Sequence, residues 1–457
     1  MLTKQLSDFL HGLRYEDLPE QAVDQAKMCV EDLVGVAVAG SARPQGEIWR
    51  GYFFSLPQRP ESTAWDGRWN ALLCEYAAAL NAAYAHVIDM DDVHNASITH
   101  LGAVTIPAAL AVGQKYHRSG KEVLTAIAAG YEAGARIGQA INPGSYHYWH
   151  TTGVVGSFSS AVAAGKLLGL NQQQMLNAVG SAGTQSAGLW QFIQDGAMSK
   201  TLHTANATLC GIRAAQLAAL GFTAAQDILG GKRGFLGAMT GQSHPELLVQ
   251  DLGRAPYRIQ TNSFKPYACC RHTHSANYCV ELLKQERPID PERIVRITDY
   301  TYQVAKDNVD AAAPATPYAF KFSVQYCIAA QFLYGALTEA QFSAEKTGAP
   351  ALRRLMDKTT VAVDPALEAM YQADHNCWPH RLEVELEDGC VLVRQVEYPF
   401  GDFHNPFQWS DAHSKFLSLT QGLMPREQAE EMIRRFTRLD ALEDVNLLFP
   451  APIQSFE

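Results

Sequence analysis

The sequence predicts a mainly α-helical protein with a large all-helical domain and a smaller α+β domain. Apolar residues recur at helical spacing up to about residue 260, without alternation of strands and helices. Residues 265–399 combine helical spacing with two stretches of strand pattern. Residues 409–449 return to an amphipathic helical pattern, so we expect residues 400–457 to join residues 1–264 in one domain.

In the all-helical domain, turn and cap signals set the expected boundaries. Pro19 marks the start of a second helix within residues 3–40, and Pro107 marks the start of a helix that ends near residue 116. Residues 41–70 are polar and rich in Pro, Gly and Trp, which predicts a loop with a short irregular piece. We expect further helices at 71–86, 121–141, 154–168, 172–189 with Asn171 as N-cap, and 203–219, and a loop at 190–200.

In the α+β domain, two stretches have the alternation of β-strands. Residues 293–302 alternate and are rich in β-branched side chains, which predicts a strand. Residues 381–397 alternate on both sides of a Glu-Asp-Gly turn, which predicts a β-hairpin. Helices are expected at 273–287, 322–337 and 338–356.

Composition limits the classes of function. The 457 residues carry a net charge of −10 and no long basic run, which argues against a nucleic-acid partner. No apolar run reaches transmembrane length, and the N-terminal residues resemble neither a signal peptide nor a mitochondrial presequence. The nine cysteines are irregularly spaced and form no Cys-x-x-Cys pair, which predicts reduced thiols in a cytoplasmic protein. Because no apolar run is long enough, we expect no membrane partner.

The densest group of ionisable side chains lies between two apolar helical stretches. Neighbouring carboxylates raise one another's pKa values, which favours proton transfer. Two alternatives stay open for this cluster: a divalent-metal site, which no fixed ligand spacing supports, and a solvated helix end. Three histidines and three aspartates form it: His86, Asp89, Asp91, Asp92, His94 and His100.

Three other segments carry candidate site residues. His147 and His150 precede a small-residue helix, whose positive end suits an anion. Lys200 stands before another small-residue helix. Near the predicted domain boundary follow Lys265, Arg271, His272 and His274, which suit carboxylate binding.

No Gly-x-Ser-x-Gly, Walker or dinucleotide-binding motif occurs. The adjacent Cys269 and Cys270 lack a neighbouring glycine loop of the oxyanion-hole type, so we expect them to serve packing. The residues therefore predict acid/base chemistry on a small anionic substrate, without a nucleotide.

Four motifs, in this order along the chain, resemble the MmgE/PrpD family. They are His-Val-Ile-Asp-Met-Asp-Asp-Val-His at 86–94 with Thr-His-Leu-Gly-Ala-Val-Thr-Ile-Pro at 99–107, His-Thr-Thr-Gly at 150–153, Met-Ser-Lys-Thr-Leu-His at 198–203, and Lys-Pro-Tyr-Ala-Cys-Cys-Arg-His-Thr-His at 265–274. The family includes 2-methylcitrate dehydratase, cis-aconitate decarboxylase and iminodisuccinate epimerase. The resemblance implies a homodimer in which residues 265–399 form a lid over the helical domain.

The expected function is that of a cofactor-independent lyase, a dehydratase that acts on a 2-methylcitrate-like hydroxy-polycarboxylate through an α-carbanion. A cis-aconitate-type decarboxylase and an iminodisuccinate-type epimerase pass through the same carbanion and are the alternatives. Two rivals of other classes are a non-catalytic carboxylate-binding scaffold and a metal-dependent hydrolase.

The residues and the resemblance together assign roles, with no metal ligand among them. Asp89 or a nearby histidine is expected to remove the α-proton, and His150 or His100 to protonate the leaving hydroxyl. Lys200 is expected to bind carboxylates together with Arg271 and His274. Catalytic roles are expected for Asp89, His100, His150, Lys200 and His274, and substrate-binding roles for Asp92, His94, His147, Arg271, His272 and Tyr302.

Two positions depart from the family pattern. Val93 stands where members often carry threonine, and Leu101 where they often carry proline. The hydroxyl that is absent at Val93 would alter a substrate contact. We expect Ser97 or Thr99 to replace it.

Overall fold

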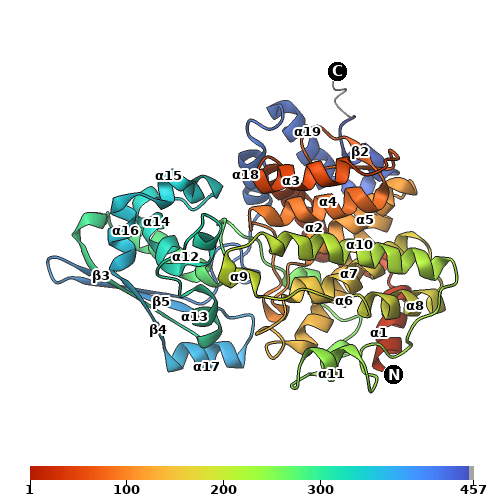
Figure 1. Ribbon diagram of the computed structural model, residues 1–457, viewed down its shortest axis with the longest axis horizontal. Coiled ribbons are helices and arrows are strands. Elements are labelled where there is room, and N and C mark those ends of the chain that lie inside the picture. The colour runs from red at the N-terminus through yellow and green to blue at the C-terminus, as the bar shows by residue number, and fades with distance from the viewer. Residues whose placement is uncertain (452–457) are drawn as a thin grey trace.

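The computed structural model describes residues 1–451, and it confirms a mainly α-helical protein. Figure 1 shows a helical part that holds both ends of the described chain, and beside it a smaller part that contains the main sheet. One large hydrophobic core draws on residues from Leu6 to Phe449, and a second core fills the space between the sheet and its helices. The second core also takes Val36 and Met90 from the helical part. The domain boundaries and the role of the smaller part as a lid stay predictions.

The helical part is built from long helices that pack closely. Its C-terminal helices contact the N-terminal helix α2, so the tail does return to this part. The helices are α1 (Leu2–Gly12), α2 (Glu20–Ser41), α3 (Pro44–Phe54), α4 (Cys74–Val87), α5 (Leu101–Lys115), α6 (Gly120–Ile141), α7 (Thr151–Leu167), α8 (Gln172–Gly183), α9 (Phe192–Asp195), α10 (Ser199–Ala219), α11 (Phe235–Met239), α18 (Trp409–Thr420) and α19 (Arg426–Thr437). A pair of two-residue strands, β1 (Ser62–Thr63) and β2 (Ala71–Leu72), lies between α3 and α4.

Helix starts in this part were predicted with mixed success. Pro19 is the N-cap of α2, and the side chain of Asn171 caps α8, as predicted. The expected start at Pro107 is wrong, because α5 begins six residues earlier and the proline lies inside it. α5 is buried over almost its whole length, and this packing outweighs the one backbone hydrogen bond that a proline cannot make.

Several expected boundaries also differ. The predicted loop at 41–70 contains α3, whose Trp49 and Phe53 stack on one face at 5.9 Å between ring centroids. α8 ends at Gly183 rather than 189, because Leu189 pairs with Trp149 in a β-bridge. The predicted tail helix is two helices, since Gly422 adopts a φ of +76° between them.

The smaller part has a four-stranded sheet in the order β4-β3-β5-β6, with β3 and β4 parallel and the other pairs antiparallel. The predicted strand and hairpin are confirmed, whereas β4, α13 and α17 were not predicted and the helix expected at 338–356 is broken before Pro350. The elements are α12 (His274–Glu286), β3 (Ile294–Thr301), α13 (Gln303–Val309), α14 (Val324–Tyr334), α15 (Ala344–Thr347), α16 (Pro350–Asp357), β4 (Thr359–Val363), α17 (Pro365–Ala373), β5 (His380–Leu386) and β6 (Val391–Val396).

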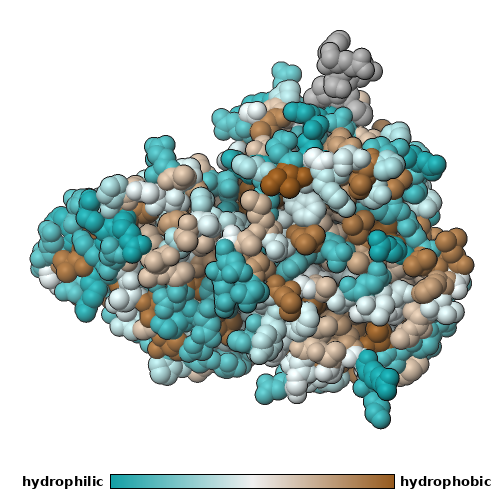
Figure 2. Space-filling model, viewed as in Figure 1, coloured by the Kyte–Doolittle hydropathy of each residue, from teal (hydrophilic) through white to brown (hydrophobic). Residues whose placement is uncertain are grey.

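Within residues 1–451, no helix combines the length and the apolar character that a membrane span requires. On the face shown in Figure 2, hydrophobic residues are scattered among hydrophilic ones over both parts. Such scattering is usual for the surface of a folded protein.

Candidate active site

The four motif segments meet in one closed pocket, to which both parts of the molecule contribute. Six of the residues predicted from sequence line it: Asp89, His100, His150, Lys200, Arg271 and His272. The remaining wall is mostly apolar and aromatic: Val93, Ile98, Tyr146, Trp190, Cys270, Phe322 and Trp378. The cavity measures about 20 Å³, which is room for little more than one water molecule. Side chains around the pocket must therefore move before a polycarboxylate can enter.

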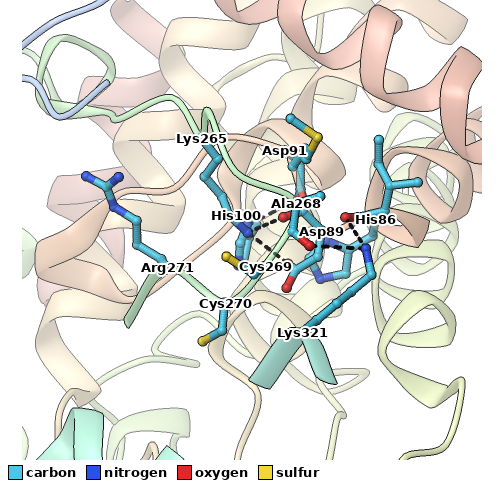
Figure 3. A network of polar contacts seen from close by, with 12 residues as sticks. His86, Asp89, Asp91, His100, Lys265, Ala268, Cys269, Cys270, Arg271 and Lys321 are labelled. Carbon is cyan, nitrogen blue, oxygen red and sulfur yellow. Dashed lines mark hydrogen bonds and ion pairs between the residues drawn. The ribbon is translucent and has the colours of Figure 1, made fainter. Parts of the chain in front are cut away.

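Asp89 lies at the centre of the charged network, immediately after α4. Its Oδ1 accepts hydrogen bonds from Lys200 Nζ at 2.7 Å and Lys265 Nζ at 3.0 Å. Its backbone carbonyl also accepts from Lys265, whose side chain reaches Asp89 in Figure 3. All three side chains are buried. Burial alone would raise the pKa of Asp89, but the two ammonium groups outweigh it and hold that pKa well below its usual range.

Asp91 orients two histidines of the cluster. Its Oδ2 lies 2.7 Å from His86 Nδ1 and 3.3 Å from His100 Nδ1. His100 Nδ1 also lies 2.9 Å from the carbonyl oxygen of Asp92, so this nitrogen carries the proton and Nε2 is the ring atom left for proton transfer. Burial lowers the pKa of His86 to about 4, which keeps its imidazole neutral.

His150 is the N-cap residue of α7, as its place before a small-residue helix suggested. Its Nδ1 lies 3.0 Å from His203 Nδ1, and its ring stacks on His86 with 5.6 Å between centroids. Burial lowers the pKa of His150 well below its usual value, and the neighbouring imidazoles of His203 and His86 lower it further. The Nε2 atom has no hydrogen-bond partner within the described residues, so it is free to meet a substrate.

Arg271 and His272 form the opposite wall. Arg271 Nη2 donates to Asp402 Oδ2 at 2.8 Å, and its Nη1 lies 3.3 Å from His274 Nδ1. His272 stacks on Trp378 at 4.1 Å, and its Nδ1 lies 2.6 Å from the Tyr302 hydroxyl. His274 and Tyr302 stand behind the wall and support residues that line the pocket.

Comparison with known families accounts for this arrangement. The MmgE/PrpD N-terminal domain matches residues 4–248, and the MmgE/PrpD C-terminal domain matches residues 267–440. The chain belongs to the MmgE/PrpD family.

Similar proteins of the MmgE/PrpD family are named as decarboxylases. Cis-aconitate decarboxylase of Aspergillus terreus (strain NIH 2624 / FGSC A1156) is 27% identical, with 98% of this chain and 95% of the relative aligned. The proteins of that name from Mus musculus and Homo sapiens are 26% and 25% identical, again over 98% of this chain and over 92% and 93% of theirs.

Besides Tyr302, three further predicted substrate-binding residues of this MmgE/PrpD chain lie outside the pocket wall. Asp92 Oδ2 accepts hydrogen bonds from Tyr131 and Asn262 behind the wall, at 2.7 and 2.6 Å. His94 is buried between the hydroxyls of Ser97 and Thr261. His147 is exposed and lines a separate surface cavity beside the pocket.

The side chain at position 93 does face the pocket, and it is apolar there. The expectation that Ser97 or Thr99 replaces the absent hydroxyl is wrong. Ser97 binds His94, and Thr99 donates to the carbonyl oxygen of Ser97 at 2.8 Å, so neither hydroxyl lines the pocket.

Two residues act differently from the sequence prediction, and the aromatic wall was not predicted. Lys265 was expected to bind carboxylate, but it does not line the pocket and instead donates to Asp89. Asp91 was predicted only as a member of the cluster, and it contacts both His86 and His100. The aromatic residues Trp190, Phe322 and Trp378 carry no signal that separates them from ordinary core residues.

The cluster also resembles a metal site. His86, Asp89, Asp91 and His100 each offer a ligand atom, and these atoms lie within 4.8 Å of one another. Imidazole and carboxylate suit a divalent cation. However, Asp89 already binds two ammonium groups, whose charges would repel a cation at that carboxylate.

Proposed function

We propose that this protein is a cofactor-independent lyase acting on a small polycarboxylate, and that its reaction is decarboxylation of a cis-aconitate-type substrate. The observation that carries the proposal is the convergence of Lys200 and Arg271 with His100 and His150 on one closed pocket. Similarity to cis-aconitate decarboxylases along 98% of the chain supports it. The dehydratase expected from sequence is less well supported, because these relatives favour the decarboxylase alternative.

The proposed reaction breaks one carbon–carbon bond. A substrate carboxylate leaves as CO₂, and the electron pair of the broken bond forms an allylic carbanion conjugated with a neighbouring carboxylate. Lys200 and Arg271 lie where they can bind the remaining carboxylates and stabilise this negative charge. The carbanion is then protonated at carbon by a pocket histidine, His100 or His150, which takes up a solvent proton on Nε2 and passes it on.

In this scheme Asp89 is not the base. A carboxylate with a pKa held well below its usual range is a poor proton acceptor. Its role is to hold the ammonium groups of Lys200 and Lys265 in place. Arg271 is held in the same way by Asp402.

Proton NMR of the purified protein in D₂O tests the proposal. Cis-aconitate, 2-methylcitrate and citrate are incubated separately with the protein. Loss of CO₂ from cis-aconitate, with deuterium incorporated into the product, is expected. Formation of a new alkene from 2-methylcitrate would favour the dehydratase, and deuterium exchange without net change an epimerase. No change in any substrate would contradict the proposal.

Independence from metal belongs to the same proposal. Because Asp89 pairs with Lys200 and Lys265, prolonged dialysis against EDTA should leave turnover within about twofold of the untreated protein. Elemental analysis of the active protein should find no stoichiometric divalent metal. Loss of turnover that returns on adding one metal would instead support the hydrolase-type metal site.

A further inference from the structure

Lysine side chains surround the turn that carries Asp89. The last carbonyl groups of a helix have no partner within the helix, and the helix end is partly negative. In the turn that directly follows α4, starting at its C-cap Ile88, three successive carbonyl groups each accept from a lysine ammonium group. Lys321 Nζ donates to Ile88 at 2.7 Å, Lys265 Nζ to Asp89, and Lys415 Nζ to Met90 at 2.8 Å. We call these three lysines the lysine collar.

Lys321 reaches the turn from the smaller part of the molecule. It lies on the 3-10 helix Ala319–Phe322 and is 2% exposed. Its ammonium group also donates to the carbonyl of Ala268 at 3.2 Å and pairs with Glu339. In Figure 3, Lys321 and Lys265 approach the Asp89 turn from opposite sides. Lys321 therefore ties the turn to elements of the smaller part.

Lys415 reaches the same turn from the helical part. It lies on α18, close to the C-terminus, and its side chain is 8% exposed. Besides the carbonyl of Met90 it binds Asp32 Oδ1 on α2 at 2.6 Å. A lysine more than 320 positions away in sequence thus fixes the residue between Asp89 and Asp91.

The turn needs such support because its backbone conformation is unfavourable. Asp89 has a φ of +58°, in the left-handed region that residues with a side chain rarely adopt. Residues in such conformations persist only where the surroundings hold them. The collar supplies contacts from both parts of the molecule, and the orientation of the Asp89 carboxylate follows from the turn.

We propose that Lys321 and Lys415 are positioning residues for the lyase reaction. By holding the backbone of 88–90, they keep Asp89 Oδ1 where it orients Lys200 and Lys265 in the pocket. Neither Lys321 nor Lys415 lines the pocket, so their effect on turnover is indirect. The kinetic part of this inference rests on the proposed function.

The test compares Lys321→Met and Lys415→Met with a matched control. Lys166→Met is the control, because Lys166 Nζ caps the end of α1 in the same manner, 2.8 Å from the carbonyl of His11, and does not line the pocket. A small displacement of catalytic groups lowers rates strongly. We therefore expect kcat to fall by about 10- to 100-fold in both collar variants with KM within about threefold, and to stay unchanged in the control.

The conservative variant Lys415→Arg keeps the charge and the donors and should recover most of kcat. A second measurement does not depend on turnover: hydrogen–deuterium exchange of the peptide 86–94 should accelerate in both Met variants and not in Lys166→Met. Thermal unfolding of every variant shows which proteins are folded. If either Lys321→Met or Lys415→Met does not fold, the exchange and kcat of the folded one test the inference.

Wild-type protein without turnover would contradict the proposed function, and the exchange measurement would still decide the inference. Unchanged exchange and unchanged kcat in a folded collar variant would overturn it. An equal loss of kcat in Lys166→Met would overturn it as well, because the effect would then reflect general destabilisation.

Discussion

At the scale of single residues, charge pairing explains what each side of the pocket can do. Asp89 holds two ammonium groups and Asp402 holds the guanidinium of Arg271, so the cations are already in place before a substrate arrives. Preorganised charges of this kind stabilise a developing carbanion without rearrangement at the moment of reaction. Burial lowers the pKa values of His86, His150 and His272, so these three imidazoles are neutral before a substrate binds.

Asp89→Asn tests the first of these pairs. Removing the carboxylate charge frees Lys200 and Lys265 from their common partner, so kcat should fall by about 10²-fold or more, the scale of a misplaced catalytic group. Glu132→Gln is the matched control, since Glu132 is equally buried and pairs with Arg136 at 2.7 Å away from the pocket. Steady-state kinetics on folded protein would contradict the account if Asp89→Asn kept kcat within threefold of wild type.

Residue identity was predictable from the sequence where a short motif carries the side chain. His100, His150 and Lys200 each belong to such a motif, and all three line the pocket. The direction of a side chain was not predictable. Val93 and His94 are neighbours in extended backbone, so they point to opposite sides, and only Val93 faces the pocket. Nothing in the sequence around the left-handed turn at Asp89 specifies which of the two does so.

At the scale of elements, small residues allow the helices around the site to approach one another closely. Gly211 in α10 faces α7, and an added Cβ would lie 2.4 Å from Ser160 Cβ and 2.7 Å from the carbonyl oxygen of Ser157. The second of these neighbours is backbone and cannot turn away. The contact fixes the spacing of the helices that carry Lys200 and His150.

Gly211→Ala should therefore destabilise the protein by about 1–3 kcal/mol, the usual range for an overpacked core. In an open helix the same change would stabilise it by about 1 kcal/mol. Gly237→Ala in α11 is the control, because no atom lies within 4 Å of its added Cβ. Urea unfolding measures both, and a Gly211→Ala protein as stable as the control would show that the helices do not pack as described.

Helix periodicity predicted most long helices, but their ends depend on tertiary contacts. α10 begins at Ser199, four residues before its predicted start, so Lys200 lies in its first turn rather than ahead of it. The short α9, α13 and α17 lack a long apolar pattern and were not predicted. Lys321 and Lys415 have no motif at all, because their function depends on reaching a turn that is distant in sequence.

At the scale of the whole molecule, buried histidines make stability depend on pH. Burial lowers the pKa of eight of them. The pKa falls to about 4 for His86 and His203 and to about 3 for His94 and His272. It is also lowered for His150, His274, His375 and His413. The unfolded chain binds these protons near pH 6.5, and the folded protein does not.

Stability should therefore rise with pH from about 4 to 6.5 and stop rising above that window. Five carboxyl groups act in the opposite direction because burial raises their pKa values: Glu31 to about 9, Asp92 to about 7, and Asp32, Asp66 and Glu281. The histidines outnumber these carboxyl groups, so the free energy of unfolding should still increase with pH across this window. Urea midpoints measured across this range check the sign, and a maximum near pH 4.5 would be inconsistent with buried neutral histidines.

The predicted homodimer is the remaining proposal at this scale. Light scattering after size-exclusion chromatography should give about 100 kDa, twice the chain mass of 50.1 kDa. A mass near 50 kDa at micromolar concentration would show a monomer.

The central claim is that the pocket around Asp89 decarboxylates a cis-aconitate-type substrate. The most direct measurement is the CO₂ released from cis-aconitate by the purified protein, compared with Asp89→Asn. The account predicts one CO₂ for each cis-aconitate consumed, and release at least about 10²-fold slower in the variant. Folded wild-type protein that releases no CO₂ from cis-aconitate, or a variant that releases it at the same rate, would contradict the claim.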